Sequence, residues 1–354
     1  MSITTIAKDT TYKIEIAAVP DSLAWDSYIA LCAESAPAHS FGWFHAFQGA
    51  YGHCPLYCIA KQDQKVQGVL PAYLIQIPLK GSVITSMPFL DSGGPCTESP
   101  DVQQALLQAL IQKASALNVN YVEIRSLTEL QLPVAAELAK VTLTMPLVQN
   151  SQELWKHLNA KVRNQVRKAQ KSGLTFEQAG AERLQDFYRI WAINMRDLGS
   201  PPHSLTFFEE IFKAFGKDAH LHLVCKSAKP IGGLIGLTCG DTFAVPWASS
   251  LREFFKLCPN MLLYWETIKR ACELGCKTFD FGRSGRNQGT YHFKKQWGAD
   301  EKQLYWYTIP VKSKAVHKIS GEDTTGRLLT SIWKKLPLGL TIWFGPKIRK
   351  YLTQ

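Results

Sequence analysis

The chain has 354 residues, of which 46% are hydrophobic and 19% are charged, and its formal net charge is +11. This composition excludes an intrinsically disordered chain, and the length suits about two domains with full hydrophobic cores. The sequence shows neither the apolar core of a signal peptide nor a run of roughly 18 apolar residues, so we expect a cytoplasmic protein whose nine scattered cysteines are reduced thiols and bind no metal.

The first half of the chain predicts an α/β pattern built on a sheet of mixed direction. Alternating or continuous apolar runs bounded by polar turns predict strands, and apolar residues at helical spacing predict helices. The expected strands are 12–18, 56–60, 66–77, 82–87 and 121–125, and the expected helices are 22–33, 41–51 and 102–117.

The second half follows the same logic. A basic helix is expected over 151–172, with Ser151 as its N-cap and Gly173 just after its end. Further helices are expected over 184–198, 205–215 and 261–274, strands over 174–178, 220–225, 231–239, 243–249, 278–281 and 304–309, and a short element over 291–297.

An internal repeat relates the two halves. Residues 118–126 and 275–284 both follow a predicted helix, form a strand and end in Arg-Ser, with Arg125 and Arg283 separated by 158 positions. Residues 61–74 and 226–238 also share a pattern, since each has a polar turn, then a glycine and an apolar strand. We therefore predict an N-terminal domain over 1–150, a C-terminal domain over 151–311 that carries the site, and a tail over 312–354.

Positive charge gathers in two places. Residues 312–354 contain nine Lys/Arg and two Asp/Glu, mixed with Trp, Phe and Leu, and prolines and glycines in this tail exclude one continuous helix. Such a tail either packs on the second domain or docks on an anionic membrane. On the basic helix, Arg163 and Arg167 share one face, which is either solvated or binds phosphate or nucleic acid.

The stretch 278–300 is the main candidate site. A buried strand ends there in closely spaced glycines, basic residues and aromatics, and then a short element carries Lys294. Arginine offers a fixed fork of donors and lysine a point charge, so this composition suits an anionic ligand, whereas the alternative is a solvated basic hairpin loop. The candidate residues around Lys294 are Arg283, Ser284, Asn287 and Tyr291.

A second group of candidates precedes the meander of the second half. Asn194, Arg196 and Asp197 end a predicted helix, and His203 follows in a proline-rich loop. His203 has no Ser/His/Asp or Cys/His arrangement around it that would make it a catalytic base, so it either touches substrate or is incidental. Trp247 belongs to the same set of candidates.

Several motifs together resemble the FemAB family, and most closely its FemAB-related subgroup associated with exopolysaccharide and PEP-CTERM protein-sorting loci. The matching segments are 88–95, 163–173, 194–204, 247–250, 252–260 and 278–300. The resemblance covers roughly residues 10–310 and implies an α/β (α+β) fold of two tandem GNAT-like domains with mixed sheets.

The resemblance also implies transfer of an acyl or aminoacyl group to an amine. Phe293-Lys294 matches a Phe-Lys pair whose lysine stabilises charge during transfer, which suits the electrostatics of a developing oxyanion. The implied donor is an aminoacyl-tRNA or an acyl-CoA, with no tightly bound cofactor. Segment 252–260, where GNAT enzymes have a glycine-containing pyrophosphate loop, has no glycine, and no tRNA-binding coiled-coil arm is inserted.

We therefore expect an acyltransferase that modifies an amine on an anionic cell-envelope or exopolysaccharide precursor, such as a precursor of peptidoglycan bridges. Lys294 would stabilise charge, Arg283, Asn287, Tyr291 and Arg196 would hold the acceptor, and tRNA and an anionic membrane are candidate partners. One alternative is a non-catalytic module that binds a glycolipid or a sugar nucleotide. Another is a nucleic-acid-binding protein that acts through residues 163–171.

Overall fold

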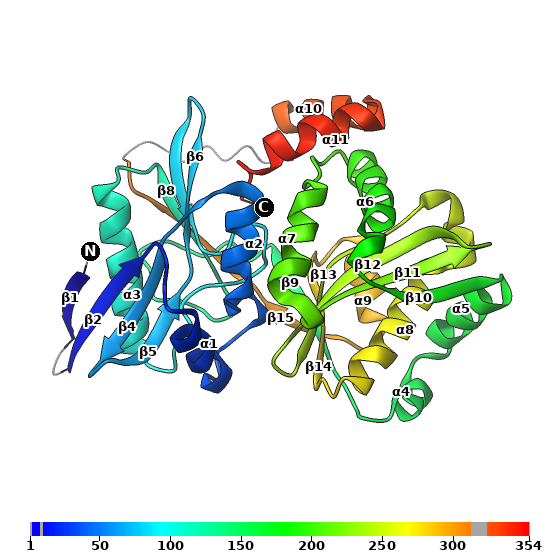
Figure 1. Cartoon of the computed structure of the whole chain (residues 1–354), viewed down its shortest axis with the longest axis horizontal. Helices are drawn as coiled ribbons and strands as arrows, with labels where there is room; N and C mark the ends of the chain where they lie inside the picture. The colour runs from blue at the N-terminus through cyan, green and yellow to red at the C-terminus, as the bar shows by residue number, and fades with distance from the viewer. Residues whose placement is uncertain (1, 8–9, 313–323, 354) are drawn as a thin grey trace. The chain divides into compact units, whose positions relative to one another are not determined.

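The computed structural model describes residues 2–7, 10–312 and 324–353 and divides the chain into two compact units (Figure 1). Unit 1 comprises Met1–Val141, Gln303–His317 and Tyr351–Gln354, and unit 2 comprises Thr142–Lys302 and Lys318–Lys350. In both units helices pack on β-sheets, which confirms the predicted α/β class.

Unit 1 contains two sheets. The first has the order β1-β2-β4-β5, formed by Ser2–Ala7, Thr10–Ala17, Tyr57–Gln62 and Lys65–Leu70. The second has the order β16-β8-β7-β6-β3, formed by Tyr305–Pro310, Tyr121–Ser126, Gly81–Thr85, Tyr73–Ile77 and Cys54–Pro55. Every pairing is antiparallel except that of β7 with β8, which is parallel.

Three helices complete unit 1: α1 (Ser22–Leu31), α2 (Gly42–Tyr51) and α3 (Pro100–Ala116). Ser99 caps α3 through a hydrogen bond from the Val102 N–H, and α3 then buries its apolar stripe, including Leu106 and Leu110, against β4 and β5. Burying each such leucine contributes about 1.5–3 kcal/mol, so α3 is held by its apolar face rather than by its ends.

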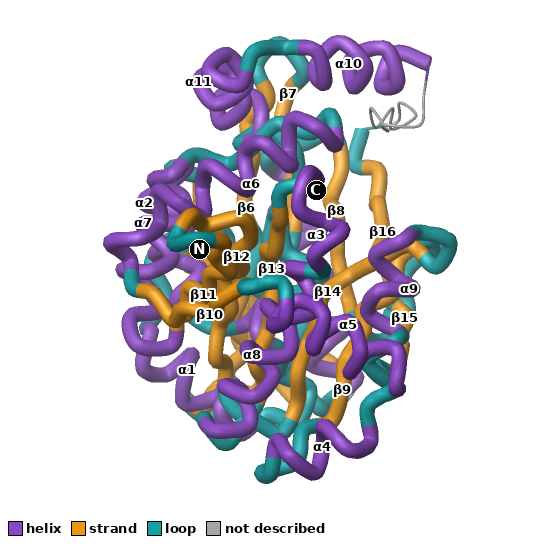
Figure 2. Tube along the Cα trace, turned by 90° about the vertical axis from the view of Figure 1, so that its right-hand side faces the viewer, coloured by secondary structure: helices purple, strands orange, loops and turns teal. Residues whose placement is uncertain are grey.

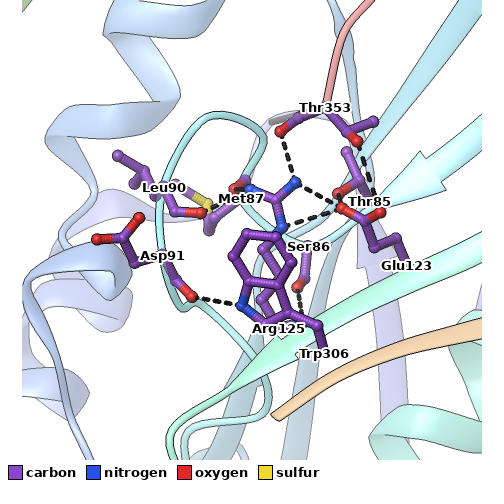
Figure 3. A network of polar contacts seen from close by, with 9 residues as sticks. All are labelled: Thr85, Ser86, Met87, Leu90, Asp91, Glu123, Arg125, Trp306 and Thr353. Atoms are coloured by element: carbon purple, nitrogen blue, oxygen red, sulfur yellow. Dashed lines mark hydrogen bonds and ion pairs between the residues drawn. The ribbon is translucent and has the colours of Figure 1, made fainter. Parts of the chain in front are cut away.

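A buried network lies where β7 and β8 end (Figure 3). Arg125 and Glu123 have fully buried side chains, and Arg125 donates to Glu123, to the Leu90 carbonyl (2.6 Å) and to the Thr353 carbonyl (2.5 Å). The Trp306 ring covers the guanidinium at 4.6 Å. The Arg-Ser ending noted in the sequence is thus, in unit 1, an internal polar support.

Unit 2 is built on one seven-stranded sheet of the order β10-β11-β12-β13-β14-β9-β15. The strands are β9 (Lys140–Pro146), β10 (Leu174–Ala179), β11 (Ala219–Lys226), β12 (Lys229–Cys239), β13 (Thr242–Ser250), β14 (Thr278–Gly285) and β15 (Asp300–Gln303). The predicted three-stranded meander, β11 to β13, is confirmed, and β13 pairs with β14 in parallel.

Helices cover both faces of this sheet. α5 (Ala160–Lys171) and α8 (Pro259–Glu273) pack on one face, and α6 (Leu184–Leu198) and α7 (Leu205–Phe215) pack on the other (Figure 1). Two short helices, α4 (Ser151–His157) and α9 (Gly289–Lys295), flank them. The strand–helix–strand order is β7-α3-β8 in unit 1 and β13-α8-β14 in unit 2, and in each unit the two strands pair in parallel. This common order agrees with the predicted repeat.

The part of the tail that the structure describes forms two helices joined by a short turn, α10 (Thr324–Lys335) and α11 (Leu338–Arg349) (Figure 2). Pro337 separates them, which confirms that the tail is not one continuous helix. Both helices contact α6 within unit 2. The first part of the predicted tail, 313–323, lies outside the described residues.

Two predicted elements are wrong because each is interrupted. The expected strand 66–77 is two strands, since it breaks at Pro71, which has no N–H for a ladder; β5 then pairs with β4 and β6 with β7. The expected helix 151–172 is α4 and α5, because Leu158 and Asn159 adopt extended ψ angles. The cap of α4 is Asn150 rather than Ser151, whereas Gly173 follows α5 with the expected positive φ of 72°.

Strand pairing also departs from chain order. The strand expected over 304–309 falls within the predicted C-terminal domain, whereas β16, Tyr305–Pro310, pairs with β8 within unit 1. Strands β1, β3, β9 and β15 were not predicted. The partner of β16 is not readable from local periodicity, because a strand's partner is selected by contacts far away in the chain. Strand β9, in contrast, does carry a local signal, since Val141, Leu143 and Met145 alternate with polar residues.

Candidate functional site

The candidate site begins where β13 and β14 stop pairing. Their parallel ladder covers only Thr242–Ala244 with Thr278–Asp280, although β13 continues to Ser250 and β14 to Gly285. Just beyond the ladder, Gly282 turns the backbone with a φ of +75°, a conformation that favours glycine. The Asp280 carboxylate supports this turn by accepting the Gly282 N–H at 2.8 Å.

Lys294 anchors the end of β14. It lies on α9 and is buried, and its Nζ donates to the Gly282 carbonyl at 2.9 Å and to the Arg283 carbonyl at 2.8 Å. Its neighbour Phe293 packs edge-on against Tyr264, with ring centroids 5.0 Å apart. Two backbone carbonyls therefore hold the Lys294 ammonium in a fixed, buried position, and the packing of Phe293 on Tyr264 anchors the same helix.

The other candidates on this segment range from buried to exposed. Ser284 is buried and donates to the Thr290 hydroxyl at 3.2 Å, Arg283 is half-buried, and Asn287 is exposed. Tyr291 donates to Glu301 at 2.8 Å; this hydrogen bond raises the pKa of Tyr291 and lowers the pKa of Glu301. The structure thus gathers Arg283, Ser284, Tyr291, Phe293 and Lys294 around the β14–α9 turn, as the sequence predicts for one segment.

The end of α6 is tied to the end of β13. Asn194 donates to the Ser249 hydroxyl at 3.0 Å. Arg196 donates from Nε and Nη2 to one oxygen of Asp197 at 3.0 and 2.8 Å, and the other oxygen of Asp197 lies 4.0 Å from Arg252 Nε. These contacts join a predicted group of site residues to Ser249 and Arg252, which are not among the residues predicted from the sequence.

Asp197 also lines a surface pocket of about 270 Å³. The lining comes from α6, from the start of β12 and from the segment after β13: Asp186, Arg189, Ile190, Ile193, Asp197, Lys229, Pro230, Leu251, Arg252 and Glu253. Three cations and three carboxylates therefore surround one hollow. Their separation in the sequence, over nearly 70 positions, left no local signal that would have identified the pocket.

His203 and Trp247 belong to an aromatic cluster rather than to an open surface. His203 has no exposed area; its ring stacks on Phe207 at 4.2 Å and its Nε2 accepts a hydrogen bond from Arg349 at 3.2 Å. Trp247 meets Phe207 edge-on at 5.5 Å. Burial, with the nearby charge of Arg349, holds the pKa of His203 well below its usual range, so this histidine is neutral and positions its loop.

The neutral histidines of unit 2 predict a pH dependence of stability. Burial lowers the pKa of His222 on β11 to about 3, and its Nδ1 lies 2.8 Å from the Thr267 hydroxyl. A histidine in the unfolded chain has a pKa of about 6.5. The stability that neutral His222 contributes is therefore fully present above that pH, and it is lost as the pH falls from there towards the folded pKa. Between about pH 7 and pH 5 we expect a loss of about 2 kcal/mol from His222 alone.

The loss of stability between pH 7 and pH 5 can be measured by hydrogen exchange of the β11 amides at the two pH values. His222→Gln should remove that share of the pH dependence, while His203 still contributes loss in the same direction. An unchanged pH dependence in His222→Gln would show that His222 is not the titrating group.

Arg163 and Arg167 lie elsewhere, on α5, which packs on α8 and β10. The exposed guanidinium of Arg167 stands 5.6 Å from the Trp155 ring, which in turn contacts Trp265 at 4.6 Å. Within the described part of the chain, the buried Nε of Arg163 has no hydrogen-bond acceptor. In that same part no cluster of His, Cys, Asp or Glu is arranged to hold a metal ion.

Comparisons with known proteins agree on the fold. Residues 156–295 match the family described as Acetyltransferase (GNAT) domain. Among solved structures, FemX is similar with 16% identity and a TM-score of 0.66, covering 90% of this chain and 99% of FemX. No curated protein matches the sequence.

Two further solved structures extend the likeness. A tandem GNAT protein from the clavulanic acid biosynthesis pathway has 12% identity and a TM-score of 0.56, covering 86% of this chain and all (100%) of that one. L-PGS from Bacillus licheniformis has 12% identity and a TM-score of 0.51, covering 91% of this chain and 100% of that one. The predicted pair of GNAT-like domains is confirmed.

Proposed function

We propose that this chain, which has a FemAB-like tandem GNAT fold, is an N-acyl- or aminoacyltransferase that modifies an amine on an anionic cell-envelope or exopolysaccharide precursor. The observation that carries the proposal is the buried Lys294 ammonium, held by two carbonyls at the end of β14. It lies inside the segment that matches the GNAT domain and next to the point where β13 and β14 stop pairing.

A fixed cation assists acyl transfer by stabilising the negative charge that develops on the acyl oxygen. The amine nitrogen attacks the acyl carbonyl carbon, and negative charge develops on the carbonyl oxygen. The C–N bond forms, the C–S bond of a thioester or the C–O bond of an aminoacyl ester breaks, and the proton of the amine leaves with the departing sulfur or oxygen. Because the Gly282 and Arg283 carbonyls already orient Lys294, its charge needs no reorganisation as the oxyanion forms.

The pocket along α6 suits the acceptor. The amine binds as an ammonium, whose charge the Asp186, Asp197 and Glu253 carboxylates of the pocket complement, and it releases one proton to solvent before its nitrogen attacks. The same hollow offers cations from Arg189, Lys229 and Arg252, which suit a phosphate or carboxylate on the same molecule. A precursor that carries both an amine and an acidic group therefore matches the mixed lining.

This assignment predicts a binding defect on removing one carboxylate. Asp197→Asn should raise KM for the amine acceptor about 10- to 150-fold and leave kcat within about twofold, because a charge-assisted hydrogen bond contributes about 1.5–3 kcal/mol. Steady-state kinetics with varied acceptor measure both constants. Asp300→Asn, at the exposed start of β15, is the matched control. An unchanged KM in Asp197→Asn would remove the pocket from acceptor binding.

The donor is identified by a direct assay. The full chain is incubated with lipid-linked precursors and either an aminoacyl-tRNA pool or an acyl-CoA pool. The masses of the products are then measured by mass spectrometry. The added mass identifies the transferred group, and sensitivity to RNase assigns the donor to tRNA. If no pool yields a product while a glycolipid or sugar nucleotide still binds, the chain is a binding module rather than an enzyme.

A further inference from the structure

The two C-terminal helices expose a large amount of apolar surface. Six side chains of α10 and α11 illustrate this: Leu328, Ile332, Leu340, Trp343, Phe344 and Ile348. Leu328 is 62% exposed and Trp343 is 57% exposed, values far above those of core residues. Scattered exposed leucines are ordinary on protein surfaces, but a group this dense within two short helices marks an interaction surface.

This exposure does not come from a loosely attached tail. The opposite side of α11, formed by Thr341, Gly345 and Arg349, is buried. A Cβ on Gly345 would meet the Pro202 ring at 2.3 Å, so the helix backbone lies directly on the loop before α7. Arg349 contacts the buried His203 at 3.2 Å. Because this side is fixed to unit 2, the apolar side of α11 is held facing outward.

The charge of the two C-terminal helices indicates which kind of partner this apolar surface binds. Residues 324–353 contain six Lys/Arg and no Asp/Glu. Lys334 and Lys335 end α10 in exposed positions, and Lys347 lies 3.8 Å from the Trp343 ring on α11. Leucine, tryptophan and phenylalanine interleaved with lysine, and without a single carboxylate, match an anionic bilayer surface, where apolar parts enter the acyl boundary and ammonium groups stay at the headgroups.

We propose that the α10–α11 hairpin docks the protein on an anionic membrane surface through this face. Within the described residues no helix is both long and apolar enough to cross a bilayer, so the hairpin lies on the surface. The packed side and the exposed side then have separate roles, since one attaches the hairpin to unit 2 and the other meets the lipid. Docking would bring the α6 end of unit 2, which both helices contact, close to lipid-linked molecules.

The test is vesicle flotation of the full chain with phosphatidylcholine alone and with added phosphatidylglycerol. We expect binding to the anionic vesicles only, weakened by salt. The triple variant Lys334→Gln, Lys335→Gln, Lys347→Gln should bind about 100-fold more weakly, since each lysine near the surface contributes about 1 kcal/mol. The double variant Trp343→Glu, Phe344→Glu should lose binding. Leu138→Glu, at an exposed apolar position in unit 1, should bind as the parent does.

Three outcomes would overturn the proposal: binding that is equal for both kinds of vesicle, binding that survives both hairpin variants, or a hairpin-dependent shift to dimers in light scattering without lipid. The last would assign the face to a second copy of the chain. All substituted positions are exposed, and circular dichroism checks that the variants fold. Because flotation does not measure transfer, failure of the docking proposal and failure of the transferase proposal remain distinguishable.

Discussion

Replacing Lys294 by methionine is expected to lower kcat for acyl transfer by about 100- to 1,000-fold, the range found when one oxyanion-stabilising donor is removed. Methionine keeps much of the length and volume of the lysine but supplies no charge and no N–H. The loss should appear at saturating substrate, because the ammonium would act on the negative charge that develops during attack, and not on the bound ground state. Single-turnover mass measurements with the identified donor would give the rate directly.

Lys294 also supports the fold, so its two roles have to be separated. Its contacts with the Gly282 and Arg283 carbonyls hold the turn after β14, and their loss should destabilise unit 2. Lys295, the next residue of α9, is exposed and provides the control: Lys295→Met should retain both activity and stability. If Lys294→Met is destabilised but transfers at the parental rate, Lys294 is a structural residue and the catalytic charge lies elsewhere.

Replacing Glu123 by glutamine should destabilise unit 1 by about 3–5 kcal/mol. Glutamine retains the shape of the side chain but removes the charge, which leaves the Arg125 guanidinium buried without its counterion (Figure 3). The carbonyls of Leu90 and Thr353 satisfy its donors but do not neutralise it. Urea unfolding, followed by hydrogen exchange of the β8 amides, would measure the loss in the unit that contains the pair.

A surface pair offers the comparison within the same unit. Lys13 and Glu15 form an ion pair at 3.0 Å in which the lysine is 52% exposed, so Lys13→Gln should cost no more than about 1 kcal/mol. A cost for Glu123→Gln as small as that of Lys13→Gln would mean that the buried pair is not needed in its charged form. The double variant Glu123→Leu, Arg125→Met should recover most of the loss, because no unpaired charge then remains.

Most elements were predictable because their signals are local. Helices α6 and α7 begin and end where the apolar period and the caps predict, and Gly199 follows α6 with a positive φ of 81°. The two interrupted elements have local causes, but each signal is weaker than the apolar pattern around it. Asn159 caps α5 through its side chain and so breaks a helix whose composition otherwise favours continuity. Pro71 divides a strand whose apolar run continues on both sides.

The sequence points to the residues of the candidate site to different degrees. Glycines, basic residues and aromatics mark the segment that contains Tyr291, whereas Phe293 and Lys294 are selected within it by the resemblance to the FemAB family. Arg189, Lys229 and Arg252 were not selected, because each is an ordinary surface cation until α6, β12 and the segment after β13 bring them to the same pocket. His203 was selected although it is not accessible. Its position in a polar, proline-rich loop predicts an exposed side chain, whereas Trp191 and Phe207 enclose its ring.

By itself the sequence determined the α/β class, the duplication and the segment that carries Lys294, because apolar period, glycine stops and repeated order are properties of neighbouring residues. Only the tertiary structure decided which groups meet. It places two backbone carbonyls on the Lys294 ammonium, pairs β16 with β8 in unit 1, and buries one side of α11 on Pro202 while Trp343 faces outward. These outcomes depend on packing between distant parts of the chain, which no local pattern encodes.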